Sequence, residues 1–158
     1  MNDYLKKDLE GFLCESFVLH KKEYKHLDQE NALNFIAQFI ELIFENYLEL
    51  IDMNDIDNIE YFFNFYKEKY SENSEFLLWE MYYKERMFDI PYTKRKLMNL
   101  IGNNPEKLVL YFPFNSFNID GDFSKEENNL IETKLLELSK WLKEQPKTTR
   151  INLILSYF

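Results

Sequence analysis

The stretch that decides the fold is DQENALNFIAQFIELIFENYLELI, residues 28–51. On a helical wheel its polar side chains fall within an arc of about 100°, and nearly every other position is apolar. A helix of this kind is packed against neighbouring elements on most sides. Asp28 directly precedes the pattern and is a favourable N-cap residue. The sequence therefore predicts a central helix that begins at Asp28 and runs to residue 51.

Helical spacing of apolar residues continues on both sides of this segment. It predicts further helices over residues 3–24, 54–70, 75–88, 91–102 and 124–144, the last opened by the capping box Ser124-Lys-Glu-Glu127. Two short apolar runs, at 108–112 and 151–157, favour strands, which could belong to a strand–helix–strand unit. We therefore expect a mostly α fold, a bundle of five to six helices with a small two-stranded β element in the C-terminal third.

Length and composition favour a single domain over residues 1–158. The chain has 46% hydrophobic residues and only three glycines and four prolines, and no long polar linker divides it. The first residues lack the apolar core of a secretion signal, and no segment is apolar enough to cross a bilayer. A lone cysteine, Cys14, fits a reducing compartment. We expect a cytoplasmic protein.

Charge is the least evenly distributed property of the chain. The formal net charge is −9, from 28 acidic and 19 basic residues. No Lys, Arg or His occurs between Leu27 and Tyr66, so the whole excess of acid lies in this window. The nine acidic residues of the window are Asp28, Glu30, Glu41, Glu45, Glu49, Asp52, Asp55, Asp57 and Glu60.

Several of these acids share the polar arc of the 28–51 helix, together with Asn34 and Gln38. Glu41, Glu45 and Glu49 are like charges four residues apart, a spacing that destabilises an isolated helix by a few tenths of a kcal/mol per pair. A basic partner would relieve this repulsion and would be attracted from a distance. The alternative is an ordinary solvated surface paired with lysines of a neighbouring helix. The predicted partner-binding residues are Glu30, Glu41, Glu45, Glu49, Asp52 and Asp55.

One segment invites comparison with a calcium-binding loop. With Gly121 at the sixth loop position, the ligand positions fall on oxygen-bearing side chains at Ser116, Asn118, Asp120 and Glu127. A tight Asp120-Gly121 turn followed by the capping box accounts for the same residues. The turn is the favoured interpretation.

Other candidate sites are incomplete. Glu23 and His26 have the Glu-x-x-His spacing of di-iron bundles, but such sites need a second copy. Cys14 lacks a correctly placed histidine, since His20 lies six residues away, and a structural thiol is favoured. No phosphate-binding glycine loop or catalytic serine motif occurs. We therefore expect no enzyme activity, no cofactor and no metal, and at a pI of about 4.8 no nucleic-acid binding.

In overall character, a small acidic helical chain without a catalytic motif, the sequence resembles the immunity proteins of bacterial polymorphic toxin systems, including contact-dependent growth inhibition. The resemblance implies binding and neutralisation of one cognate toxin domain, often a basic nuclease, with no membrane or nucleic-acid partner. It gives no indication of self-association. An acidic nucleic-acid mimic of the phage-inhibitor type is the alternative, and a small metal-binding protein or enzyme is a further one.

Overall fold

A computed structural model describes residues 1–45, 47 and 53–158, with the side chains of residues 53–57 left undescribed. The chain is mostly helical, as predicted. Its helices are α1 (Asp3–Leu9), α2 (Leu13–Lys22), α3 (Gln29–Phe44), α4 (Met53–Lys69), α5 (Glu75–Phe88), α6 (Lys94–Asn103), the 3-10 helix η1 (Leu108–Tyr111), α7 (Pro113–Ser116), α8 (Lys125–Glu144) and α9 (Thr149–Leu155). Two short strands, β1 (Tyr92–Thr93) and β2 (Ile119–Asp120), pair in parallel, with Tyr92 opposite Ile119.

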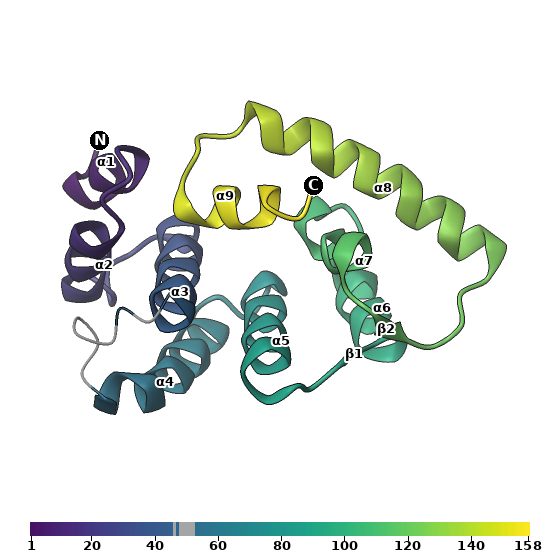
Figure 1. Cartoon of the computed structure of the whole chain (residues 1–158), viewed down its shortest axis with the longest axis horizontal. Helices are drawn as coiled ribbons and strands as arrows, with labels where there is room; N and C mark the ends of the chain where they lie inside the picture. Colours follow the sequence, from purple (N-terminus) through teal and green to yellow (C-terminus); the bar gives the residue numbers. More distant parts are fainter. Residues whose placement is uncertain (46, 48–52) are drawn as a thin grey trace.

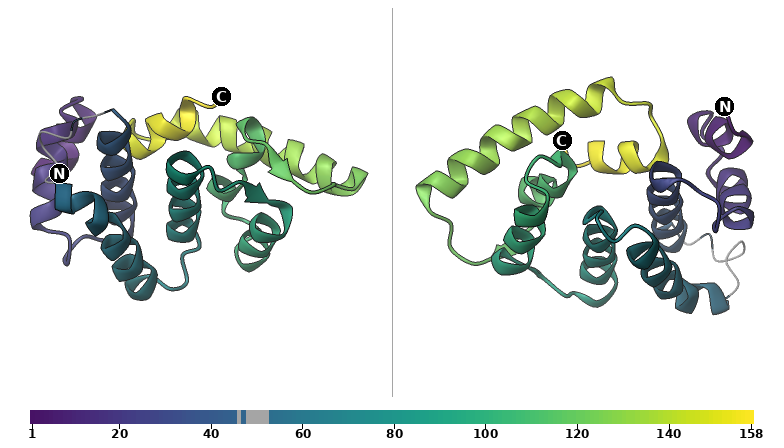
Figure 2. Two further views of the ribbon diagram at one scale, coloured as in Figure 1. Left: turned by 60° about the horizontal axis from the view of Figure 1, so that its bottom comes forward. Right: turned by 180° about the vertical axis from the view of Figure 1, so that it is seen from behind.

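Helix α3 lies at the centre of the first half of the fold, between α2 and α5, and it also contacts α4 and α9 (Figures 1 and 2). The long helix α8 crosses the opposite half of the molecule and packs against η1, α7 and α9. Residues 32–40 of α3 are all buried. The central helix is therefore wrapped on every side over this stretch, including the side that carries Asn34 and Gln38.

The helix starts follow the capping residues that the sequence provides. The Asp28 carboxylate accepts a hydrogen bond from the Asn31 N–H at 2.9 Å, which confirms the predicted start of α3. Ser124 and Glu127 form the predicted capping box at the start of α8. The predicted end of the central helix at residue 51 was wrong, since α3 ends at Phe44, Glu45 is its C-cap and residue 47 is not helical. The rest of the predicted extension, residues 46 and 48–51, lies outside the described residues.

The predicted number of helices was wrong, since the described residues form nine α-helices instead of five or six. One reason is Gly11, which has a φ of +83° and separates α1 from α2 where one helix over 3–24 was predicted. The other two additional α-helices are α7 and α9, and both apolar runs predicted as strands are helical, the first as the 3-10 helix η1 and the second as α9.

Tertiary packing accounts for those two runs. Residues 108–112 form η1 and the turn after it, with Val109, Leu110, Tyr111 and Phe112 all buried, and Pro113 begins α7. Residues 149–155 form α9, which the Thr148 side chain caps and which buries Ile151, Leu153 and Ile154. The small two-stranded element exists, but it joins residues 92–93 to 119–120 and not the predicted segments. Tertiary packing of these apolar side chains overrides the strand preference of short apolar runs.

One continuous hydrophobic cluster connects the elements. It is rich in aromatic rings, with Phe35 and Phe39 of α3 packed on Phe17 of α2 and Phe62 of α4. Among the residues that the structure describes, no helix combines the length and the apolar character that crossing a membrane requires.

Candidate functional site

The structure does not place the predicted acidic residues on one exposed stripe. Glu30 lies in the first turn of α3 and pairs with Arg150, whereas Glu41 and Glu45 lie at the other end of the helix. Between them the arc is interior, because Asn34 is 3% exposed and Gln38 is fully buried. Glu49 and Asp52 fall outside the described residues, and the Asp55 side chain is not described.

The interior part of the arc contacts a buried carboxylate of α1. Asp8 is 5% exposed and accepts hydrogen bonds from Asn34 Nδ2 and Gln38 Nε2, each at 2.8 Å. The Thr149 N–H, at the start of α9, donates to the same carboxylate at 2.8 Å. The Thr149 hydroxyl also donates to it. Asp8 thus joins α1, α3 and α9, and the hydrogen bonds that it accepts compensate the desolvation of its charge.

A second buried carboxylate is Glu75, in the first turn of α5. Hydrogen bonds connect it through Arg150 to Asn34 and Asp8. We call this set of buried polar residues the polar seam: Asp8, Asn34, Gln38, Glu75, Thr149 and Arg150. The Arg150 guanidinium donates to both of its oxygens, from Nε at 2.7 Å and from Nη2 at 3.0 Å. The Trp79 indole N–H donates to it at 3.1 Å, and Lys107 Nζ lies 3.3 Å away. Burial alone would raise the pKa of Glu75, but the charges of Arg150 and Lys107 outweigh it and hold the pKa below its ordinary value. We interpret this seam as structural.

The opposite end of α3 has a different character. Arg86, near the end of α5, lies with its guanidinium carbon 4.2 Å from the centre of the Phe44 ring and donates a hydrogen bond to the Tyr82 hydroxyl at 2.8 Å. Phe44 packs on Tyr83, and Tyr83 in turn meets the exposed ring of Phe88. These contacts hold a cation on an aromatic surface at the junction of α3 and α5.

Two carboxylates, those of Glu41 and Glu85, interact with this cation. Burial raises the pKa of the half-buried Glu41, and the neighbouring Glu45 raises it further, against the opposing charge of Arg86. Burial likewise raises the pKa of Glu85, with Asp89 adding to the shift and Arg86 opposing it. Glu41 and Glu85 thus stand near the Arg86 guanidinium, with Glu45 beside the first and Asp89 beside the second. We call this set the acidic–aromatic face: Glu41, Phe44, Glu45, Glu85, Arg86, Phe88 and Asp89.

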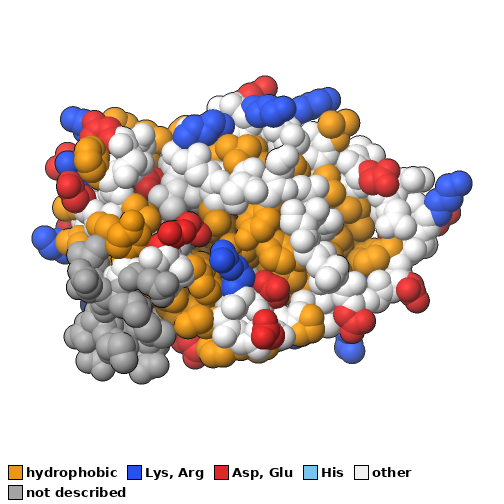
Figure 3. Space-filling view, viewed as in Figure 1, with side chains coloured by type: hydrophobic (Ala, Val, Ile, Leu, Met, Phe, Trp, Pro, Cys, Tyr) orange, Lys and Arg blue, Asp and Glu red, His pale blue; other side chains and the backbone are white. Residues whose placement is uncertain are grey.

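The turn after α5 exposes apolar side chains beside these charges. Asp89 has a φ of +50°, which is uncommon for a residue other than glycine, and its N–H donates to the Lys84 carbonyl. On either side of it Phe88 is 58% and Ile90 43% exposed. In Figure 3, hydrophobic side chains gather in the middle of one face of the molecule with acidic and basic side chains among them. Exposed apolar groups with a polar rim are typical of protein-binding surfaces.

The residues considered for a calcium loop make other contacts. The Glu127 carboxylate pairs with Lys94 at 2.6 Å and caps α8 through the Ser124 N–H. The Ser116 hydroxyl donates to the Tyr157 carbonyl at 3.1 Å. Within the described part of the chain, no three His, Cys, Asp or Glu side chains are grouped so that they could hold a metal ion.

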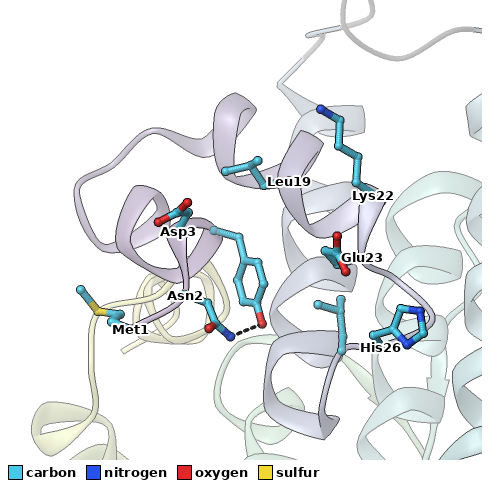
Figure 4. Close-up of a pocket in the computed structure, with 9 residues that line it drawn as sticks. Met1, Asn2, Asp3, Leu19, Lys22, Glu23 and His26 are labelled. Carbon is cyan, nitrogen blue, oxygen red and sulfur yellow. Dashed lines mark hydrogen bonds between the residues drawn. The ribbon is translucent and has the colours of Figure 1, made fainter.

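Glu23 and His26 line a recess of about 530 Å³ between the end of α2 and the N-terminal residues. Figure 4 shows Asp3 and Asn2 on the opposite wall of this recess from Glu23 and His26. His20 is not part of it, since the ring is fully buried and its Nδ1 lies 3.0 Å from the Ser16 carbonyl oxygen. Cys14 is half-buried and packs against the core.

The comparisons with known proteins add no relative. No protein-family model, no curated protein and no solved structure matches the chain.

Sequence reasoning did not find the part of the acidic–aromatic face that α5 contributes, namely Glu85, Arg86, Phe88 and Asp89. A signal was present in the run Glu85-Arg-Met-Phe-Asp-Ile90, where a helix ends among both charged and large apolar residues. Asp8, Glu75 and Arg150 were also missed. No local signal could have revealed them, because Asp8 and its partner Thr149 lie 141 positions apart.

Proposed function

We propose that this protein is a protein-binding module of the immunity type, which binds a cognate basic toxin domain and neutralises it through the acidic–aromatic face. One observation carries the proposal: at the junction of α3 and α5, Glu41 and Glu85 stand near Arg86, each with a second carboxylate beside it, and Phe88 and Ile90 are exposed in the turn that follows.

Arg86 does not fully stabilise the charged carboxylates at this face, so a partner could stabilise them further. Glu41 keeps a raised pKa although Arg86 lies beside it, because burial and Glu45 outweigh that one cation. An additional positive charge from outside would lower the free energy of the Glu41 and Glu85 carboxylates. This supports a basic partner over an acidic one.

The composition of the face suits a binding hot spot. Aromatic residues and arginine are enriched at the centres of interfaces, and charged side chains at the rim mainly affect the association rate. Phe88 and Arg86 would form the centre here, with Glu45 and Asp89 at the rim. The formal charge of −9 would steer a basic domain toward the protein over longer distances.

The experiment uses the toxin domain that an immunity protein of this type is expected to have encoded directly upstream. That domain is expressed with and without this chain, and growth and direct binding of the two purified proteins are both measured. The proposal predicts rescue of growth and a one-to-one complex. Toxicity that persists in the presence of the folded chain, with no complex formed, would show that the proposal is wrong.

Breadth of inhibition separates this proposal from the nucleic-acid mimic. The purified chain is added to several unrelated nucleases as well as to the cognate domain. Inhibition confined to the cognate domain supports an immunity protein. Inhibition of several nucleases, lost at high salt, would favour an acidic mimic whose carboxylates replace phosphates.

A further inference from the structure

A recess lies away from the acidic–aromatic face, where the start of α3 meets the turn between α8 and α9. This recess has a volume of about 360 Å³. Leu5, Pro146 and Ile151 provide apolar wall, and the Trp141 indole provides an aromatic surface. Asp28, Glu30 and Arg150 supply its charged groups.

The positive charge of Arg150 is already satisfied. Arg150 is only 6% exposed, and its guanidinium donates to both oxygens of Glu75 through Nε and Nη2 and to Glu30 through Nη1. The guanidinium is held by these carboxylates as a fixed part of the wall. An incoming anion would have to displace Glu30 from it.

Negative charge dominates the recess and the seam behind it. Glu30 and Glu75 pair with the cations Arg150 and Lys107, whereas Asp8 and Asp28 accept hydrogen bonds from neutral groups. Glu30 uses its Oε2 for Arg150, and its side chain remains 69% exposed at the mouth. A cation that enters the recess would therefore meet a carboxylate that is accessible and only partly neutralised.

We propose that this recess binds the side chain of an arginine. The guanidinium would pair with Glu30 and stack on the Trp141 indole, and its aliphatic stem would lie against Leu5, Pro146 and Ile151. As a deepening of the proposed function, which it assumes, the arginine belongs to the basic partner and anchors it at a second point. The acidic–aromatic face is charged and open, whereas this recess is concave and selects one side chain.

The test does not need the partner, because the recess can be probed with N-acetyl-arginine amide. The chain has two tryptophans, so two indole N–H signals report on binding in a ¹H–¹⁵N spectrum. Trp79 is fully buried and bonded to Glu75, so its signal serves as an internal reference. A Trp141→Phe variant assigns the two signals.

We expect the Trp141 signal to move saturably with a dissociation constant on the order of 1 mM, since one cation–π contact and one exposed ion pair are weak interactions. The Trp79 signal should stay in place. N-acetyl-citrulline amide, which has the same shape without the charge, should move neither signal. An equal response to both probes, or no saturable movement of Trp141, would overturn the proposal.

Glu30→Gln tests the ion pair, because glutamine still accepts the hydrogen bond from Arg150. It should weaken arginine binding about threefold to fivefold. The matched control Glu132→Gln removes an exposed carboxylate of α8 outside the recess and should leave binding unchanged. Equal affinities for the two variants would contradict the assigned role of Glu30. This experiment does not contain the toxin domain. A failure to bind arginine therefore does not contradict the immunity proposal, and arginine binding does not confirm it.

Discussion

Both ends of α3 carry polar and acidic side chains, but these side chains have different roles at the two ends. Toward the N-terminal end, Asn34 and Gln38 are buried against Asp8, and Glu30 holds the buried Arg150. At the C-terminal end, Glu41 is half-buried beside Arg86, and Glu45 is exposed. One polar arc in the sequence thus contributes to a structural seam at one end and to a candidate binding face at the other. What distinguishes them is that Asp8 of α1 and Arg150 of α9 bond to side chains of the first end, whereas Glu41 at the second end lines a recess beside these two helices.

The largest effect should come from breaking the seam. Arg150→Met leaves the fully buried Glu75 with Lys107 and Trp79 as its side-chain partners among the described residues and should lower the free energy of unfolding by about 3 to 5 kcal/mol. Denaturant unfolding measures this change. The control Arg95→Met makes the same substitution at an exposed site on α6 and should cost less than about 0.5 kcal/mol. Similar losses in both variants would mean that the seam is not a structural centre.

The next effect concerns binding, at the open end. Phe88→Ser removes an exposed ring from the acidic–aromatic face and should weaken the complex with the cognate toxin domain by about tenfold or more. Stability should change by less than about 0.5 kcal/mol. Leu136→Ser is the matched control, since Leu136 is 59% exposed on α8 and Phe88 is 58% exposed. If the two variants bind equally well, the face is not the binding surface.

The sequence predicted the helical class, the start of α3, the bounds of α5 and α8 and the capping box at Ser124, because these depend on local periodicity and on caps. It did not predict that residues 108–112 and 151–157 are helical, since short apolar runs do not distinguish a strand from a buried helical turn. It gave Glu41 and Glu45 as candidate residues. It could not divide the polar arc into two roles, because that division depends on Asp8 and Arg150, which reach α3 from the two ends of the chain.

Acid should destabilise the fold through the buried His20. Burial lowers the pKa of His20 from 6.5, against the opposing effects of the Ser16 carbonyl and of Asp8, so the folded state disfavours the protonated ring. The unfolded chain binds that proton more readily. The associated stability is therefore complete above pH 6.5 and decreases as the pH falls through the lowered pKa.

Denaturant midpoints measured above and below pH 6.5 test this pH dependence. His20→Gln should be less stable than the wild type at the higher pH but should lose less stability on acidification. The same slope in both proteins would show that His20 is not the responsible group.

A smaller effect is expected at the turn of the open end. Asp89→Gly places a residue that tolerates positive φ at +50° and should raise stability by up to about 1 kcal/mol, offset in part by the greater freedom of glycine in the unfolded chain. The thermal midpoint at high salt, where the lost charge matters little, measures the change. A clear destabilisation would indicate that the Asp89 side chain makes a contact that outweighs its backbone strain.

The central claim is that Glu41 and Glu45 serve a partner and not the fold. The double variant Glu41→Gln/Glu45→Gln tests it most directly when the denaturant midpoint and the association rate with the cognate toxin domain are measured on the same preparation. Glu126→Gln/Glu132→Gln removes two exposed charges from α8 and is the control for net charge. Removing two like charges four residues apart should leave the midpoint unchanged or raise it slightly, while association slows and depends less on salt than in the control. A destabilised double variant that associates at the wild-type rate would contradict the account.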